Sequence, residues 1–166
     1  MAEITPFPLI EISGVPRERG RMYGEKARER IRLSAGLYTE QLHRLGFDDA
    51  NIERLVTLFL PRIRDWAPDL VTEMEGIAEG AGIGLSAIVL VNARTEVLQL
   101  ARLEAGVADD EPDGCTGAAL LPEVTRDGTV IHGQNWDWRA ECADTSVVLR
   151  ILRDDGPDIL TFTEAG

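Results

Sequence analysis

The sequence predicts an α+β fold in which a helical first part is followed by antiparallel strands. Before about residue 100 the apolar residues recur at the spacing of amphipathic helices, whereas after it they come in short runs between turn residues. Residues 104–114, EAGVADDEPDG, join the two parts, and their five acidic residues favour an exposed linker. The 166 residues are enough for one ordinary domain.

Proline, glycine and capping residues set the expected helix boundaries. Pro16 and Pro68 are placed to open helices, Pro61 to kink or divide one, and Ser86 to cap the last. Gly46 and the glycine-rich stretch at 80–84 are stop signals. The expected helices cover residues 16–46, a segment from 48 or 49 through 63, then 68–80, and 86 to about 100.

Four strands are expected after the linker. They cover residues 115–121, 129–138, 146–152 and 158–166, and PEVTRDG at 122–128 is a hairpin connection between the first two. The last strand has no closing helix after it. We therefore expect half of a sheet, and a chain that is truncated relative to the natural gene product.

Composition and charge exclude several classes of function. The net charge of −12 and pI of about 4.6 argue against nucleic-acid binding, because a phosphate backbone would be repelled. No apolar run approaches the roughly 20 residues of a membrane span, and the N-terminus lacks a secretory signal, so a cytoplasmic location is expected. Two cysteines and two histidines at these spacings predict neither a disulfide framework nor a metal site, and no cofactor is expected.

Cys115 begins a predicted strand directly after the acidic linker and after Gly114. A lone cysteine is usually a small buried hydrophobe, but a structural cysteine does not need this position. A thiol that attacks the preceding carbonyl needs an unhindered neighbour, and glycine provides one. Cleavage would leave an α-amine, with a pKa of about 7.7–8.0, on the same residue as the thiol. The position therefore predicts self-cleavage between Gly114 and Cys115, with Cys115 as the nucleophile.

The segment GQNWDW at 133–138 is the second candidate element. In a strand, Asn135 and Asp137 would share one face, with Gln134 and the two tryptophans on the other. One interpretation is an amphipathic strand end with two core tryptophans. The other places Asp137 beside the Cys115 amine on the neighbouring strand, where its carboxylate would orient the ammonium or the thiol.

These two motifs resemble the acyl-coenzyme A:6-aminopenicillanic acid acyltransferase (isopenicillin-N N-acyltransferase) family of peptidase C45-like cysteine Ntn-hydrolases. The match consists of Gly114-Cys115-Thr116 and GQNWD at 133–137, with EMEGIAEGAG at 73–82 and NARTE at 92–96 upstream. More distantly, the chain is similar to bile-salt hydrolases and penicillin V acylase. The resemblance implies an Ntn-hydrolase αββα sandwich and a precursor, or zymogen, cut into an α chain, residues 1–114, and a β chain that starts at Cys115.

The resemblance also implies roles and partners. Cys115 and Asp137 would be catalytic, while Thr116, Gln134 and Asn135 would orient the substrate. The protein would be an acyltransferase or amidohydrolase that takes a small-molecule acyl donor and an amine or amide, with acyl-CoA as one candidate donor. The asparagine that stabilises the oxyanion in the family lies further downstream. Residues 115–166 would therefore be only the start of a catalytic β chain, and the remainder of that chain would be a partner. The fragment alone would be incomplete as an enzyme. A homo-oligomer is a further candidate.

Several alternatives remain open at this stage. Arg94 is interpreted either as part of a salt-bridged helix side or as a residue that reaches into the site. His132 is interpreted as structural or exposed, and Cys142 as a free thiol without a role. A classical cysteine peptidase would need a catalytic histidine, and neither His43 nor His132 lies in a sequence motif that supports that role. The non-enzymatic alternative is a catalytically incomplete homologue that acts as a binding or assembly module.

Overall fold

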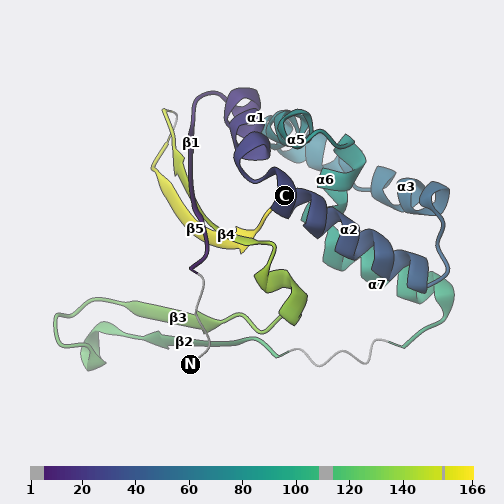
Figure 1. The fold of residues 1–166 in the computed structure, drawn as a ribbon. Coiled ribbons are helices and arrows are strands. Elements are labelled where there is room, and N and C mark those ends of the chain that lie inside the picture. Colours follow the sequence, from purple (N-terminus) through teal and green to yellow (C-terminus); the bar gives the residue numbers. More distant parts are fainter. Residues whose placement is uncertain (1–5, 109–113, 155) are drawn as a thin grey trace. The chain divides into compact units, whose positions relative to one another are not determined.

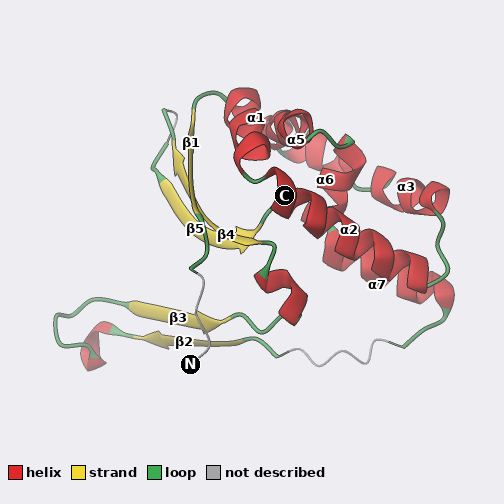
Figure 2. Ribbon diagram, viewed as in Figure 1, coloured by secondary structure: helices red, strands yellow, loops and turns green. Residues whose placement is uncertain are grey.

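The computed structural model describes residues 6–108, 114–154 and 156–166, and it is a mixed α+β protein (Figures 1 and 2). The chain forms two compact units. Met1–Asp109 and Asp144–Gly166 make the first, called here the helix-and-sheet unit. Asp110–Ala143 make the second, called here the hairpin unit. Each unit is described separately.

The helices lie in the first part of the chain, as the sequence predicts. They are α1 (Pro16–Lys26), α2 (Arg28–Arg44), α3 (Asp49–Thr57), α4 (Leu60–Trp66), α5 (Pro68–Ala81), α6 (Leu85–Asn92) and α7 (Arg94–Ala105). Pro16 and Pro68 open helices, and the expected division near Pro61 falls between α3 and α4. Asp48 caps α3 by accepting a hydrogen bond from the backbone N–H of Asn51 at 2.8 Å.

Two of the expected helices are each broken once. The first breaks at Ala27 and the last at Ala93, where the backbone leaves helical geometry. Beyond Ala27, Arg28 and Arg32 donate hydrogen bonds to Gly80 O and Ala81 O, which are carbonyl groups at the end of α5. The expectation that Ser86 caps the last helix is wrong, because α6 begins at Leu85 with Gly84 as its cap and Ser86 bonds to Glu53 instead.

Three strands form the sheet of the helix-and-sheet unit, in the order β1 (Leu9–Ser13), β4 (Ser146–Leu152) and β5 (Ile159–Glu164). β1 runs parallel to β4, and β4 runs antiparallel to β5. The strands at 146–152 and near the chain end are thus confirmed. β1 was not predicted, and its residues alternate between exposed and buried positions as a half-buried strand should.

The helices pack on one face of this sheet, as Figure 2 shows. Ile10, Ile12, Val147 and Leu149 are buried on the inner face and belong to the same apolar cluster as buried residues of the helices. The opposite face is more open. Leu9 and Phe162 flank Val148 there, with 64% and 44% of their surface exposed, and Phe7 packs edge-to-face on Phe162 with ring centroids 4.8 Å apart.

Glycines let α1 and α5 approach more closely than side chains would allow. Gly20 and Gly24 on α1 face Gly76 and Gly80 on α5. A methyl group added at any of them would lie only 2.1–2.3 Å from a backbone oxygen of the other helix, far inside van der Waals contact. The two helices therefore pack backbone against backbone.

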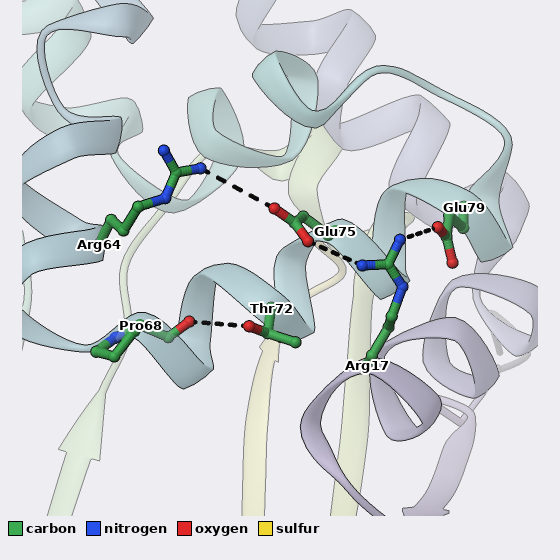
Figure 3. Close-up of polar contacts among 6 residues, drawn as sticks. All are labelled: Arg17, Arg64, Pro68, Thr72, Glu75 and Glu79. Atoms are coloured by element: carbon green, nitrogen blue, oxygen red, sulfur yellow. Dashed lines mark hydrogen bonds and ion pairs between the residues drawn. The ribbon is translucent and has the colours of Figure 1, made fainter.

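Ion pairs flank the contact between α1 and α5, as Figure 3 shows for Arg17, which reaches Glu75 at 3.0 Å and also Glu79. These pairs are half exposed and add little to stability. Arg19 and Glu73 form a mostly buried pair at 2.7 Å. Because a buried charge without its partner is costly, this pair helps to fix which faces of the helices meet.

No single helix in the described part of the chain has the length and apolar composition to cross a membrane. Only α5 and α6 taken together pass that test, and they are bent by 119° relative to each other.

Replacing Gly76 by alanine should destabilise the protein by about 1–3 kcal/mol, because the new methyl group overlaps Arg17 O and forces the helices apart. The matched control is Gly36→Ala on α2, where an added methyl meets nothing within 4 Å. That change should stabilise by about 0.5–1 kcal/mol through helix propensity. Urea unfolding measures both, and equal effects of the two substitutions would contradict the close glycine contact.

Candidate functional site

The candidate site lies in the hairpin unit, on β2 (Thr116–Leu120) and β3 (Ile131–Asn135). The strands pair antiparallel, with Thr116 opposite Asn135 and Leu120 opposite Ile131. The expected hairpin is therefore confirmed, although both strands are shorter than predicted. Of the linker predicted at 104–114, Glu104 and Ala105 instead end α7, and residues 109–113 lie outside the described part of the chain.

The turn between β2 and β3 is held by its own side chains. Thr125 donates its hydroxyl hydrogen to Thr129 O at 2.7 Å, and Thr129 donates to Asp127 Oδ1 at 2.7 Å. The Thr129 hydroxyl and then its backbone N–H lower the pKa of Asp127 below its usual value, because they stabilise the carboxylate. Gly128 takes a left-handed conformation, φ +70°. These contacts fix the turn and thereby the register of the two strands.

Cys115 and Asp137 meet at the open end of the hairpin. Cys115 is an exposed free thiol whose Sγ lies 3.7 Å from the backbone oxygen of Asp137. Gly114 faces the Asp137 side chain: a methyl group placed on Gly114 would lie 3.2 Å from Asp137 Cβ and 3.8 Å from Oδ2. The bond predicted to be cut therefore lies directly across from Asp137, and any residue larger than glycine at 114 would crowd it.

Thr116, Asn135 and Gln134 occupy defined positions beside this pair. Asn135 Nδ2 donates to Thr116 Oγ1 at 3.3 Å, which places both on one face of the hairpin. Gln134 is opposite Gly117, on the other face. The interpretation of Trp136 and Trp138 as core residues is wrong for the described hairpin, since Trp136 is half-buried and Trp138 is exposed.

Arg94 belongs to the helix-and-sheet unit, where it binds Glu164 at the end of β5. Its Nε lies 2.9 Å from Oε2 of this buried carboxylate. Tyr38 donates its hydroxyl hydrogen to the same carboxylate, 2.7 Å from Oε2, and Thr145 donates to Oε1 at 3.3 Å. The salt-bridge interpretation of Arg94 thus fits, with a partner on a strand instead of its own helix. A role for Arg94 in orienting substrate stays a prediction.

Sequence reasoning missed Glu164 and Tyr38 as members of this cluster. The two residues are 126 positions apart, and no spacing rule connects a helix tyrosine with a glutamate near the end of the chain. Arg94 also lies over the Tyr38 ring, with its guanidinium carbon 5.7 Å from the ring centroid. The cluster ties α2 and α7 to β5.

Two hollows are found in the helix-and-sheet unit. One, of about 790 Å³, lies between β1 and the junction of α1 and α2; the other, of about 320 Å³, lies between α1, α5 and the sheet and includes Tyr23 and Met74. Neither includes a predicted site residue. Among the described residues no group of three or more His, Cys, Asp or Glu side chains is placed to hold a metal ion.

Fold and site together define a mixed α+β protein with an exposed thiol just before a hairpin strand, next to a glycine that faces an aspartate. No protein-family model matches the chain. The chain is 29% identical over 158 residues to the acyl-coenzyme A:6-aminopenicillanic-acid-acyltransferase 40 kDa form of Emericella nidulans. The match covers 95% of this chain and 41% of that protein's length, and it supports a distant relationship to the penicillin acyltransferase family.

Replacing Tyr38 by phenylalanine should cost about 1–3 kcal/mol of stability, because the buried Glu164 carboxylate loses a hydrogen-bond donor while the ring remains. Tyr23→Phe is the matched control. Its hydroxyl is also buried, but among the described residues it meets the backbone N–H of Gly166 instead of a carboxylate, so the cost should be smaller. Thermal unfolding of both variants at pH 7 measures the difference, and a Tyr38→Phe protein as stable as the wild type would contradict the cluster's importance.

Proposed function

We propose that this chain is a self-processing cysteine Ntn-hydrolase that acts as an acyltransferase or amidohydrolase. The observation that carries the proposal is the position of the Gly114–Cys115 bond, with Gly114 across from Asp137 and the Cys115 thiol beside the Asp137 backbone oxygen. The distant relationship to an acyltransferase supports the same reaction class. In this proposal the chain is cut between Gly114 and Cys115, residues 1–114 become the α chain, and the β chain starts at Cys115.

The proposed reaction uses Cys115 alone for nucleophile and base. After cleavage its α-amine accepts the thiol proton, and Sγ attacks the carbonyl carbon of an amide or an acyl-CoA thioester. The C–N or C–S bond breaks, the leaving amine or thiol takes the proton from the α-ammonium group, and the acyl group stays on Sγ. An amine or water then takes the acyl group and restores the thiol. The Asp137 carboxylate would orient the ammonium group of Cys115 during these steps.

The proposed substrates follow from the same relationship. The relative's name pairs an acyl-coenzyme A with 6-aminopenicillanic acid. For this chain we propose the broader class, a small-molecule acyl donor and an amine or amide. The proposed reaction needs no resident cofactor, because the thiol and the amine supply the nucleophile and the base.

The αββα sandwich is also part of the proposal. Helices cover one face of the β1–β4–β5 sheet, and the other face exposes Leu9, Leu160 and Phe162. Apolar side chains on a sheet face are normally buried against a second layer. In an αββα sandwich, a second sheet provides that layer.

The second candidate function is a binding or assembly module without catalysis. It is favoured by β5, an edge strand with Leu160 70% exposed, because such edges pair readily with other chains. Light scattering separates the two candidates when it is combined with an acyl-transfer assay. A stable oligomer without activity supports the module, whereas a monomer that acylates small amines rules it out.

The protein purified from the cells that produce it should consist of two polypeptides that meet at Gly114 and Cys115. Intact-mass analysis and N-terminal sequencing test this directly. Cys115→Ala should remain one polypeptide and lose acyl transfer, because both steps use the same thiol. Cys142→Ala is the matched control and should be cut as the wild type is. A wild-type chain that stays in one piece yet transfers acyl groups would contradict the proposal.

A further inference from the structure

The proposed self-cleavage needs a proton acceptor other than the α-amine of Cys115, which serves as base only after the chain is cut. Before cleavage, the nitrogen of Cys115 is part of the peptide bond to Gly114. A peptide nitrogen is not basic, because its lone pair is delocalised into the carbonyl group. The α-amine that serves as base afterwards does not yet exist. The first proton taken from the Cys115 thiol therefore needs a different acceptor.

The side chains on the Cys115 face of the hairpin follow from the register. Successive residues of a strand point to opposite faces, so Cys115 shares its face with Gly117 and Ala119. Their partners on β3 are Gln134 and His132. Asp137 is opposite Gly114, on the same face as Thr116 and Asn135, and only its backbone oxygen lies near Cys115 Sγ. The register therefore gives the Cys115 face an imidazole, while the Asp137 carboxylate belongs to the other face.

The His132 ring leans along this face toward the end of the hairpin that carries Cys115. Although His132 pairs with Ala119, its Nε2 lies 4.0 Å from the point where a methyl group on Gly117 would be. Gly117 is one step closer to Cys115 on the same face, and it adds no side chain of its own between imidazole and thiol. His132 is exposed, as is Cys115, so packing does not hold either side chain in place.

We propose that His132 accepts the thiol proton of Cys115 in the self-cleavage step, an inference that rests on the proposed function. Sγ attacks the carbonyl carbon of Gly114 as the proton passes to His132. The C–N bond then breaks, the Cys115 nitrogen receives the proton from His132, and a thioester joins Gly114 to Sγ. Water hydrolyses this thioester to give the Gly114 carboxylate and the free thiol.

No charged side chain is paired with His132 in the described hairpin. Among the described residues β3 pairs only with β2, and Thr116–Leu120 has no ionisable side chain. The nearest ionisable groups along the chain are those of the turn, Glu123, Arg126 and Asp127, and those beyond β3, Asp137 and Arg139. Imidazole is the side chain that changes protonation near neutral pH, so cleavage should slow toward acidic pH.

The first test follows the cleavage of pulse-labelled chains between pH 5 and 8 in the wild type and in His132→Gln. Loss of a general base slows a reaction by about 10²–10⁴-fold, so His132→Gln should be cut at least about 100-fold more slowly at pH 7. It should also lose the acidic limb of the pH profile. Added imidazole should restore cleavage to His132→Ala, which a merely structural role would not allow.

His43→Gln is the matched control, because His43 is the only other histidine and binds Asp49 in the helical part of the chain. It should be cut at the wild-type rate. If the wild type is cut and His132→Gln follows the same rate and pH profile, the role of His132 is wrong while the proposed function stands.

A second measurement separates the two claims when the wild type is not cut. Iodoacetamide alkylation of Cys115 is followed by mass in the uncut chain with Cys142 replaced by alanine. At pH 7 it should be several-fold slower in His132→Gln than in the parent, because fewer thiols are ionised. An uncut chain with this difference overturns self-processing and with it the proposed function, and it leaves His132 only as the group that promotes ionisation of the Cys115 thiol. Equal alkylation rates overturn the role of His132.

Discussion

The close contact between α1 and α5 is the constraint on which the helical layer depends. Four glycines leave the two backbones in contact, and the methyl group of even an alanine would overlap a carbonyl oxygen of the other helix. The packed pair then fixes what surrounds it: the Arg19–Glu73 ion pair is mostly buried beside it, and Arg28 donates to the carbonyl oxygen of Gly80 near the end of α5. Since β1 leads directly into α1, the same contact helps to hold the three-stranded sheet against the helices.

A buried carboxylate makes the second connection between helices and sheet. Glu164 ends β5 and accepts hydrogen bonds from Tyr38 and Thr145 while it pairs with Arg94. Such a group is costly to bury unless every partner is in place, so it specifies one arrangement of α2, α7 and β5. The hairpin unit is held differently. Its side chains are mostly exposed, and the turn at Thr125–Thr129 together with the backbone ladder fixes its register.

Local signals predicted much of this structure, and non-local contacts account for what they missed. Pro16, Pro68 and the glycine after α5 act within one helical turn, so the boundaries that they set were predicted correctly. The breaks at Ala27 and Ala93 have no local signal, since alanine favours helices. β1 is short and pairs with β4 across most of the chain. At the site, the hairpin pattern brought Cys115 near Asp137, but only the register showed that His132 shares the Cys115 face.

Cys115 is the centre of the functional account, because the proposed cleavage and the proposed acyl transfer both use its thiol. The most direct measurement is to incubate the protein from its producing cells with an acyl-CoA and to map the acylated residue by peptide mass. The account predicts an acyl group on a Cys115 that is no longer joined to Gly114. Peptides kept at acidic pH, where the α-amine is protonated and cannot take the acyl group, should carry it as a hydroxylamine-sensitive thioester. An acyl group on another residue, or a thioester on a Cys115 still joined to Gly114, would contradict it.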